Sequence, residues 1–448
     1  MSMIEEATLD SRASVTIAEK SPAKVQGKIS KVKSIVAITV GNGLEFFEFT
    51  SYSFFAIIIG KLFFPAEGDI AQLLMITATF GIGFIARPVG GLFLGLYADR
   101  AGRKAAMTLT LSLMAIGSAI ILLAPPYAYI GVAAPVLIVL ARLIQGFALG
   151  GEIGASTSLL MEYADNNSRG FYGGLQLLSQ NASALAGSLL GLTLTTFLST
   201  ESLESWGWRL PFAIGLLMGP LGVFIRRNLH ETLDHEAQEE AKSKSTKQAI
   251  GTIFSEQWRV ILAGIAIVSA GTSAVYISMY YMPTYAKILH FPMTTGLLAS
   301  CVATGAASIF APICGMIADR VGRKKMLIMI VTVQMIVACP AFMIINSHPS
   351  LPLFLTVVGA LALLATLIGV LMTVFITEMF PKHIRATGIS IVYCVGVSLF
   401  GGFAPFISTL LIQLSGSNLA PSWYLIFCCV LCLSAVPFLV EKNGKSLD

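Results

Sequence analysis

The stretch GLYADRAGRK at residues 95–104 returns as GMIADRVGRK at residues 315–324. Asp99 and Asp319 hold the same place in the two copies and are 220 residues apart, about half of the 448-residue chain. Each copy separates two long apolar runs, so we expect each to form a charged turn between two membrane-spanning helices. The repeat indicates that the chain consists of two similar halves.

A second charged pair repeats in the same order. Glu162 is followed seven residues later by Arg169, and Glu378 is followed seven residues later by Arg385. The two pairs are 216 residues apart, which is close to the spacing of the two turns. Chance rarely produces two charged landmarks at nearly one offset, so we interpret the chain as an internal duplication.

The composition excludes an ordinary soluble protein. Hydrophobic residues make up 55% of the chain and charged residues 12%, with a mean hydropathy of +0.79, whereas about a quarter of the residues in a soluble domain are charged. Apolar runs long enough to cross a hydrocarbon core of about 30 Å occur at residues 34–59, 70–96, 105–124, 132–161, 170–198, 209–226, 259–286, 294–318, 325–346, 352–377, 384–413 and 421–440. These runs predict an all-α polytopic membrane protein with twelve transmembrane helices in two pseudo-symmetric six-helix bundles.

The expected organisation has five parts. They are an N-terminal tail (1–33), a first six-helix bundle (34–226), a linker (227–258), a second six-helix bundle (259–440) and a C-terminal tail (441–448). Lys and Arg gather in the tails, the repeated turns and the linker, so the positive-inside rule places all of these, and both termini, in the cytoplasm.

The loops expected on the opposite side carry little basic charge beyond Lys61 and Lys287. Membrane topology therefore explains the net charge of +5, and no nucleic-acid partner is expected. The first 33 residues are polar and do not form a cleavable signal. The seven cysteines show no metal-binding spacing, and the chain contains no phosphate-binding loop. We expect no metal, no cofactor and no ATP-driven step.

The first apolar run contains two acids near its middle. A rotation of about 100° per residue places several polar and aromatic residues within one arc of the helix. These residues are Asn42, Glu45, Glu48, Phe49 and Tyr52. A structural ion pair is one interpretation, but two acids three residues apart exceed what one pair requires. Burial favours the protonated form of a carboxyl group, so Glu48 or Glu45 is a candidate proton carrier, with Asn42 and Tyr52 as candidate substrate contacts.

Two arginines are expected inside the membrane. Arg87 precedes a proline in the second run and is suited either to binding an anion or to neutralising one of the two acids. In the fourth run, Arg142, Gln145 and Glu152 share one face, beside a ladder of small residues formed by Gly146, Gly150 and Gly154. Gln145 is a further candidate substrate contact, and Glu152 is a third candidate proton carrier. The guanidinium of Arg142 matches a carboxylate, either that of the substrate or that of Glu48, and a purely structural role is the alternative.

Neutral polar residues complete the candidate site. The fifth run brings Gln176, Gln180 and Asn181 inward, where amides can bind an oxygen-rich ligand or tie helices together. The second half has almost no charge inside its runs and offers tyrosines instead, among which Tyr276 is the candidate cavity residue. We therefore expect charge handling in the first half and a mostly neutral wall in the second.

The doubled turn, together with Arg142-x-x-Gln145-Gly146, resembles the major facilitator superfamily over the whole chain. More narrowly, the chain looks like the metabolite:proton symporters, which are bacterial uptake carriers. The stretches that carry this closer resemblance are EFFEFTSY (45–52), RPVG (87–90) and WGWRLPF (206–212). One departure is Glu48, where the family usually has Asp.

The resemblance implies a carrier of citrate or other di- or tricarboxylates, 2-oxoglutarate, shikimate or zwitterionic osmolytes. Arg87, Arg142 and the glutamines fit an acidic, oxygen-rich substrate better than a quaternary ammonium. The osmolyte carriers end in a long coiled coil, which is not expected after Val440. A monomer in the lipid bilayer of a bacterial inner membrane is implied, with a small organic anion and H⁺ as partners.

The resemblance also gives the repeated turn a mechanical role. Asp99 is expected at the N-terminus of a second-half helix, where the helix dipole favours an anion. Arg103 is expected to reach Glu162, and Gly95 to permit close approach. Arg169 and Arg385 belong to the same latch, which Asp319, Arg323 and Glu378 repeat in the second copy.

Proton-coupled import of an organic anion is therefore the leading hypothesis. Proton-coupled export of a drug or metabolite uses the same fold, and the sequence does not set the direction. A transporter-like sensor usually carries a signalling domain, which we do not find. An enzyme is not expected, because no combination of nucleophile, base and metal ligands occurs in the sequence.

Overall fold

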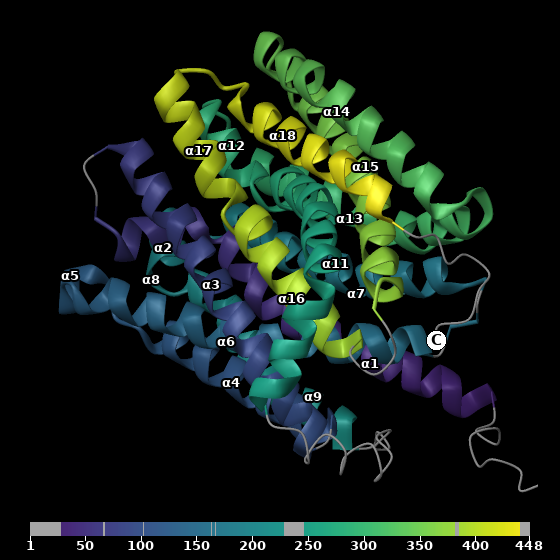
Figure 1. Ribbon diagram of the computed structural model, residues 1–448. Coiled ribbons are helices and arrows are strands. Elements are labelled where there is room, and N and C mark those ends of the chain that lie inside the picture. Colours follow the sequence, from purple (N-terminus) through teal and green to yellow (C-terminus); the bar gives the residue numbers. More distant parts are fainter. Residues whose placement is uncertain are drawn as a thin grey trace, which may run out of the picture.

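The computed structural model describes residues 28–65, 68–101, 103–162, 164–165, 167–227, 246–380 and 385–439. Most of the tails and of the expected linker therefore lies outside the described residues. The described chain is helical throughout (Figure 1). The first half contains α1 (Lys28–Phe54), α2 (Ala56–Phe63), α3 (Asp69–Ala101), α4 (Arg103–Leu123), α5 (Tyr127–Ile130), α6 (Ala133–Glu162), α7 (Arg169–Phe197), α8 (Thr200–Ser205), η2 (Gly207–Arg209) and α9 (Leu210–Arg227).

The second half repeats this helical pattern with more interruptions. Its elements are α11 (Thr246–Val275), η3 (Tyr276–Tyr280), α12 (Met282–Ile288), α13 (Met293–Val321), α14 (Arg323–Ser347), α15 (Leu351–Glu378), α16 (Arg385–Gly396), η5 (Val397–Gly402), α17 (Ala404–Ser415), α18 (Ala420–Ala435) and η6 (Val436–Phe438). Each of the expected spans coincides with one of these helices or with consecutive helical pieces.

Three spans expected as continuous helices are interrupted. The first breaks at Phe55, whose φ of −99° and ψ of 7° leave the α-helical region, and α1 and α2 meet there at a bend of 62°. The seventh and eleventh spans contain the π-helical segments η3 and η5. Such segments insert one residue into a turn and often occur at functional sites.

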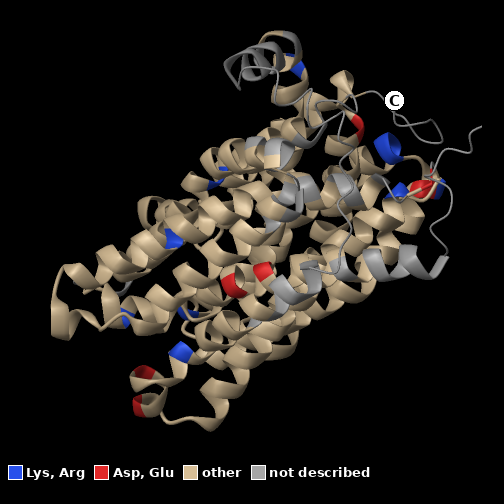
Figure 2. Ribbon diagram, turned by 90° about the horizontal axis from the view of Figure 1, so that it is seen from below, with Lys and Arg blue, Asp and Glu red and all other residues tan. Residues whose placement is uncertain are grey.

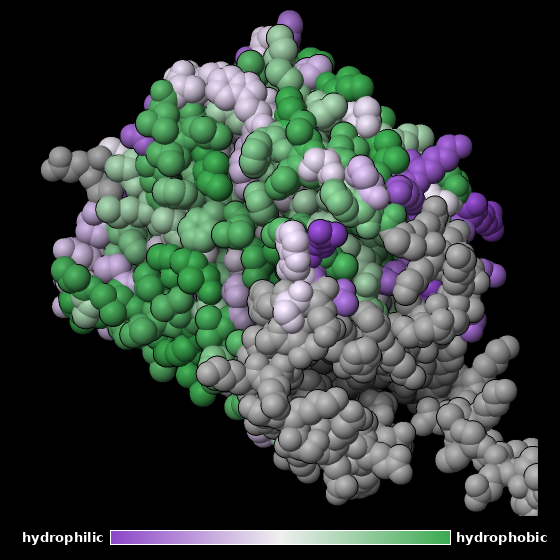
Figure 3. Space-filling view, viewed as in Figure 1, coloured by the Kyte–Doolittle hydropathy of each residue, from purple (hydrophilic) through white to green (hydrophobic). Residues whose placement is uncertain are grey.

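The helices have the length and surface of membrane spans. Within the described residues, 8 helices are long and apolar enough to cross a membrane, or up to 9 when the bent α1–α2 pair is one span. Large apolar side chains such as Phe197, Leu217 and Ile309 are exposed, as expected where lipid replaces water. Figure 3 shows a mostly hydrophobic face with hydrophilic residues along one edge, and Figure 2 shows how sparse charged residues are along the helices.

Glycines set the two closest helix contacts. Within the first half, a Cβ at Gly146 of α6 would lie 1.6 Å from the carbonyl oxygen of Gly83 in α3. Between the halves, a Cβ at Gly315 of α13 would lie 2.0 Å from the carbonyl oxygen of Gly170 in α7. The small residues let both pairs of backbones touch. The α3–α6 contact holds together the two helices that carry Arg87 and Arg142, and the α7–α13 contact joins the halves.

Replacing Gly146 by Ala is therefore expected to separate α3 from α6 and to destabilise the protein by about 3 kcal/mol or more. Thermal unfolding of the detergent-purified variant measures this loss. Gly305→Ala is the matched control, because a Cβ there meets its nearest atom, Leu185 Cδ1, at an ordinary 3.7 Å. Equal melting temperatures for the two variants would contradict the close packing.

Candidate functional site

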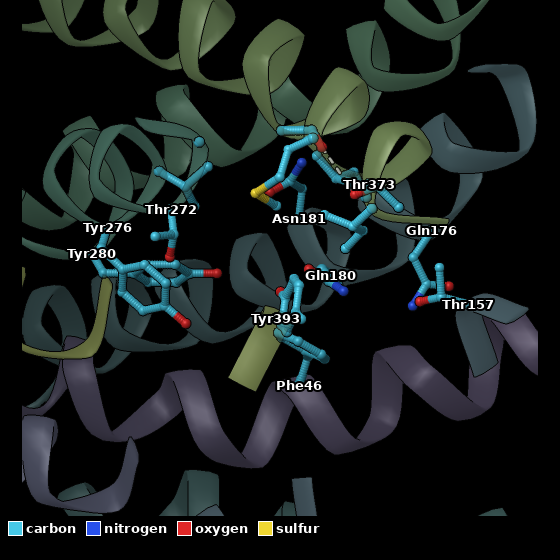
Figure 4. A pocket seen from close by; sticks show the side chains of 16 residues that line it. Phe46, Thr157, Gln176, Gln180, Asn181, Thr272, Tyr276, Tyr280, Thr373 and Tyr393 are labelled. Carbon is cyan, nitrogen blue, oxygen red and sulfur yellow. Dashed lines mark hydrogen bonds between the residues drawn. The ribbon is translucent and has the colours of Figure 1, made fainter. Parts of the chain in front are cut away.

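A small cavity lies between the two halves, with α1, α6 and α7 on one side and α11, η3, α15 and α16 on the other. Its volume is about 40 Å³, enough for a few water molecules but far below the size of a typical ligand pocket. Figure 4 shows the side chains that line it: Phe46, Thr157, Gln176, Gln180, Asn181, Thr272, Tyr276, Tyr280, Thr373 and Tyr393 are labelled. Among the described residues, the lining contains hydroxyl, amide and aromatic groups and no charged side chain.

A chain of hydrogen bonds within the first half, between α1, α4 and α6, connects a carboxyl group to a guanidinium. Ser118 Oγ of α4 donates to Glu48 Oε2 of α1 at 2.7 Å, and Gln145 Nε2 of α6 donates to Ser118 Oγ at 3.1 Å. Arg142 Nη1 donates to Gln145 Oε1 at 3.1 Å. Glu48 is 3% exposed and Arg142 is 0% exposed. Arg142 is therefore linked to Glu48 through two neutral side chains rather than by a direct ion pair.

Arg87 and Arg142, which are both buried, lie on aromatic rings. The guanidinium carbon of Arg142 is 4.0 Å from the ring centroid of Phe49 and 4.5 Å from that of Tyr52. The guanidinium carbon of Arg87 is 4.4 Å from the Phe49 centroid and 4.0 Å from the Phe84 centroid. Cation–π contacts offset part of the cost of burying these cations.

No salt bridge joins Arg87 or Arg142 to a carboxylate among the residues that the structure describes. Arg142 Nε and Nη2, which form one edge of the guanidinium, have no hydrogen-bond acceptor there, and neither do the three nitrogens of Arg87. Tyr276 and Tyr393 are electrostatic neighbours of Arg87. An anionic group could therefore still bind the guanidinium groups of Arg87 and Arg142 and neutralise their charge.

An aromatic layer separates these cations from the cavity. Phe49, Phe80 and Phe84 form a contiguous set, with the Phe49 and Phe84 rings 4.9 Å apart and nearly perpendicular. Phe84 also contacts Tyr276, which lines the cavity. Glu48 and Arg142 therefore do not line the cavity in this conformation: aromatic rings cover Arg142, and Glu48 lies against Ser118 of α4 and Gly215 of α9.

Some of the remaining candidate residues line the cavity, and others form contacts between helices instead. Gln180, Asn181 and Tyr276 line the cavity, as does Gln176. Asn42 instead ties α1 to α7, donating to Ser179 Oγ at 2.7 Å and accepting from Gln176 Nε2 at 3.2 Å.

Tyr52 lies under Arg142, and Glu45 is buried on α1. The side chain of Glu152 lies outside the described residues. No group of three potential metal-ligating side chains occurs in the part of the chain that is described.

Several cavity residues were not among the sequence-based candidates. Tyr280, Tyr393, Thr272 and Thr373 all line the cavity, and Figure 4 shows the Tyr276 and Tyr280 rings side by side. The sequence signal for Tyr280 was its place four residues after Tyr276, and the two rings lie 5.2 Å apart on the cavity wall, within the π-helical segment η3. No periodic pattern singled out the threonines.

At the end of the bundle that carries Arg323 and Lys324, here termed the basic end, the second turn joins the halves. The carboxylate of Asp319 accepts hydrogen bonds from the backbone N–H groups of Gly170 and Phe171, at 2.9 and 3.1 Å. These are first-turn donors of α7, where the helix dipole favours an anion. An acid of one half thus caps a helix of the other.

A buried ion cluster lies beside this cap. Arg169 Nη1 is 2.9 Å from Glu378 Oε1, Arg323 Nη1 also contacts Glu378, and Arg323 Nη2 is 2.8 Å from Asp319 Oδ1. Arg169 comes from the first half and the other three residues from the second. This cluster of Arg169, Asp319, Arg323 and Glu378 is termed the basic-end latch.

The first copy of the turn is less completely described. The side chains of Asp99, Arg103, Glu162 and Arg385 lie outside the described residues. A Cβ at Gly95 would meet no described atom within 4 Å. Among the described residues, the close approach is made by its counterpart Gly315, because the second turn contacts α7.

Asp319→Asn is expected to loosen the basic-end latch. The amide cannot hold two N–H donors and Arg323 as a carboxylate does, so backbone amides in the first turn of α7 should exchange hydrogen about tenfold faster, consistent with a loss of about 1–2 kcal/mol. Hydrogen–deuterium exchange of residues 169–172 measures this change. Asp165→Asn, an exposed acid in the loop before α7, is the control, and equal exchange in both variants would contradict the proposed contact.

Comparison with known proteins agrees with this architecture. The model of the Major Facilitator Superfamily matches residues 43–308 and 292–446. A citrate-proton symporter of Klebsiella pneumoniae is 33% identical over 438 residues, covering 98% of each chain. A proline/betaine transporter of Salmonella typhimurium is 32% identical over 424 residues, covering 93% of this chain and 84% of the relative.

Among solved structures, a proton:xylose symporter bound to 6-bromo-6-deoxy-D-glucose superposes with a TM-score of 0.75 at 17% identity, covering 93% of this chain and 97% of that chain. This likeness establishes a common fold. With the apolar helices, these matches identify a multi-pass protein of a bacterial inner membrane. The chain belongs to the major facilitator superfamily and, within it, groups with the metabolite:proton symporters.

Proposed function

We propose that this protein imports a small organic anion, a di- or tricarboxylate, together with protons. The observation that carries the proposal is the hydrogen-bonded connection from Glu48 through Ser118 and Gln145 to Arg142. This connection links the carboxyl group of Glu48, which can take up a proton, to the guanidinium of Arg142. No carboxylate among the described residues neutralises Arg142. The citrate-proton symporters among the relatives support the same substrate class.

The direction of the hydrogen bonds suggests how the two ligands are coupled. Ser118 donates to an ionised Glu48, and Gln145 and Arg142 donate along the same chain. Once protonated, Glu48 becomes a donor, so Ser118 and then Gln145 can reverse their roles. Gln145 would then turn its oxygen away from Nη1 of Arg142, so the guanidinium would attract a substrate carboxylate more strongly at its Nε–Nη2 edge, which has no described acceptor. Proton and substrate would thus load together.

Transport follows from movement of the halves about the cavity. Rocking of two pseudo-equivalent bundles exposes a central site alternately to each side. We assign residues 34–226 and 259–440 to these bundles and the basic end to the cytoplasm, with both termini and the 227–258 linker on that side. The basic-end latch would hold that side closed, and a monomer in the bilayer would suffice for transport.

A second candidate is uptake of a zwitterion such as a betaine. The cavity lining is uncharged and contains Tyr276, Tyr280 and Tyr393, and aromatic rings of this kind bind quaternary ammonium groups. Proline/betaine transporters are also among the relatives. Arg87 and Arg142 favour the organic anion, because a di- or tricarboxylate can bind both cations, whereas a betaine has one carboxylate and its ammonium group gains nothing from them.

Uptake by purified protein in liposomes separates these functions. Under an inward proton gradient, we expect radiolabelled citrate to accumulate and the accumulation to stop when an ionophore removes the gradient. Parallel assays with glycine betaine and shikimate test the alternatives. Accumulation of glycine betaine alone would establish the second candidate. Expulsion of preloaded substrate by the inward gradient would instead identify an antiporter.

A further inference from the structure

A proline in α3 leaves one backbone carbonyl without its helical hydrogen bond. Pro88 lies inside the helix and has no N–H group, so it cannot donate to the carbonyl oxygen of Phe84, four residues earlier. A buried carbonyl that lacks a donor costs free energy unless another group supplies one. The partner of this carbonyl therefore has to come from outside the α3 backbone.

The second half of the chain supplies this donor. Ser398 Oγ, in the π-helical segment η5, donates to the carbonyl oxygen of Phe84 at 2.6 Å. Ser398 is 5% exposed and Phe84 is 0% exposed, so the bond lies in a low-dielectric interior, where a hydrogen bond is stronger than in water. This hydrogen bond joins the two halves within one helical turn of Arg87.

The ring of the same phenylalanine covers Arg87. The guanidinium carbon of Arg87 is 4.0 Å from the Phe84 ring centroid. On other sides the ring meets Tyr276 of η3 edge-on, with centroids 5.3 Å apart, and the backbone of η5, because a Cβ at Gly402 would lie 2.2 Å from Cγ of Phe84. The segment η5 thus contacts both the carbonyl and the ring of Phe84 and keeps the ring over Arg87.

Movement of the halves would break this arrangement. Rocking of one bundle against the other separates elements of the second half from α3, so η5 would withdraw the hydroxyl of Ser398 and the backbone at Gly402 together. The Phe84 ring would then lose two of its supports and could rotate away from the guanidinium. Arg87 would become available to an anion only after the halves separate.

We propose that Ser398 is a positioning residue: its hydroxyl holds Phe84 over Arg87 while the halves are together, so that Arg87 is presented to the substrate only when they part. The inference rests on the proposed function, because it takes the substrate to be an organic anion. It adds a control of one cation of the site by the conformation of the two halves. Arg142 is not under this control, because the described rings that cover it belong to the first half.

The first test measures separation of the halves and does not depend on transport. Cys394 is buried one turn before Ser398, with its Sγ 3.5 Å from the carbonyl oxygen of Gly150 in the first half, so an alkylating reagent reaches it when the halves part. Ser398→Ala is expected to raise the rate at which N-ethylmaleimide modifies Cys394 about tenfold, because one buried hydrogen bond between the halves is lost. Mass spectrometry of the purified protein gives the rate, and an unchanged rate would overturn the proposal.

Two controls distinguish opening between the halves from a general loosening of the fold. Cys428 is buried in α18 of the second half, and its modification rate should stay at the wild-type value. Ser300→Ala removes a matched bond, because Ser300 Oγ donates at 2.8 Å to the carbonyl oxygen of Met279, which Pro283 cannot reach as a donor. Both partners of that bond belong to the second half, so Cys394 should stay protected in this variant. Faster modification of Cys428 as well as Cys394 in Ser398→Ala would show a loosened fold and overturn the proposal.

The second test is the response to citrate. Ser398→Ala should lower the Kd for citrate about fivefold, because a larger fraction of the protein has Arg87 uncovered and is competent to bind. The maximal rate of proton-driven uptake should fall, because the loaded protein closes less readily. Calorimetry and uptake into liposomes measure the two quantities. A Kd that is unchanged or higher would overturn the role of Ser398 in covering Arg87.

The two tests together separate this inference from the proposed function. Faster modification of Cys394 in Ser398→Ala, when the wild-type protein binds no citrate, would refute citrate as the substrate and leave the hydrogen bond between the halves supported. Proton-driven citrate uptake by the wild type, with unchanged Cys394 modification and unchanged Kd in Ser398→Ala, would refute the role of Ser398 alone.

Discussion

Replacing Glu48 by Gln is expected to abolish citrate accumulation driven by a proton gradient while preserving exchange of citrate across the membrane. The amide has nearly the same shape and still accepts a hydrogen bond from Ser118, which donates to Glu48 Oε2 at 2.7 Å. It cannot release a proton, so the coupled step loses its carrier. We expect a loss of about 100-fold or more in accumulation.

Two assays on the same liposomes measure this effect. One follows accumulation of labelled citrate under an inward proton gradient, and the other follows exchange of labelled for unlabelled citrate without a gradient. A merely structural defect would lower both. Glu45→Gln is the matched control, because Glu45 lies three residues earlier on α1 and is also buried. If Glu45→Gln alone removes accumulation, Glu45 rather than Glu48 carries the proton.

Hydrophobic runs and the repeated turn were sufficient to predict the fold. A run such as 352–377 can satisfy its backbone hydrogen bonds in lipid only as a helix, and α15 spans Leu351–Glu378. The resemblance to the family implied that Asp319, Arg323 and Glu378 take part in one latch, and these residues are in contact in the structure. The interruption at Phe55 had no such signal, since phenylalanine is common in continuous helices.

The site was harder to predict, because helix periodicity tells which residues share a face but not which neighbour covers them. Asn42, Glu48 and Tyr52 were placed on one arc of α1, yet their contacts differ: Asn42 pairs with α7, Glu48 with Ser118 of α4 and Tyr52 with Arg142 of α6.

Phe80 lies over Arg142 only because α3 packs directly on α6, whereas Phe84 and Arg87 both belong to α3. Likewise, Ser398 and Phe84 are 314 residues apart, and only the fold brings the hydroxyl of one to the carbonyl oxygen of the other.

Arg142→Lys is expected to weaken citrate binding about 100-fold. The guanidinium offers the Nε–Nη2 edge, which no described acceptor occupies, as a fork for a carboxylate, while Nη1 contacts Gln145 and the carbonyl oxygen of Phe49. An ammonium group cannot serve both directions with the same geometry. Losing a buried charged hydrogen bond costs about 2–3 kcal/mol, which corresponds to this change in affinity. Isothermal titration calorimetry of the purified protein measures it.

The number of protons taken up with citrate distinguishes a binding role for Arg142 from a structural one. In wild type, citrate binding should be accompanied by proton uptake, because Gln145 and Ser118 connect Arg142 to Glu48. Arg142→Lys breaks this connection, so the remaining binding should show little proton uptake when calorimetry is repeated in buffers of different ionisation enthalpy. Arg87→Lys is the matched control: Arg87 lies on the same Phe49 ring but outside the hydrogen-bonded chain. Its replacement should weaken binding yet leave proton uptake unchanged. Wild-type affinity and proton uptake in Arg142→Lys would show that this arginine only supports the packing of α6.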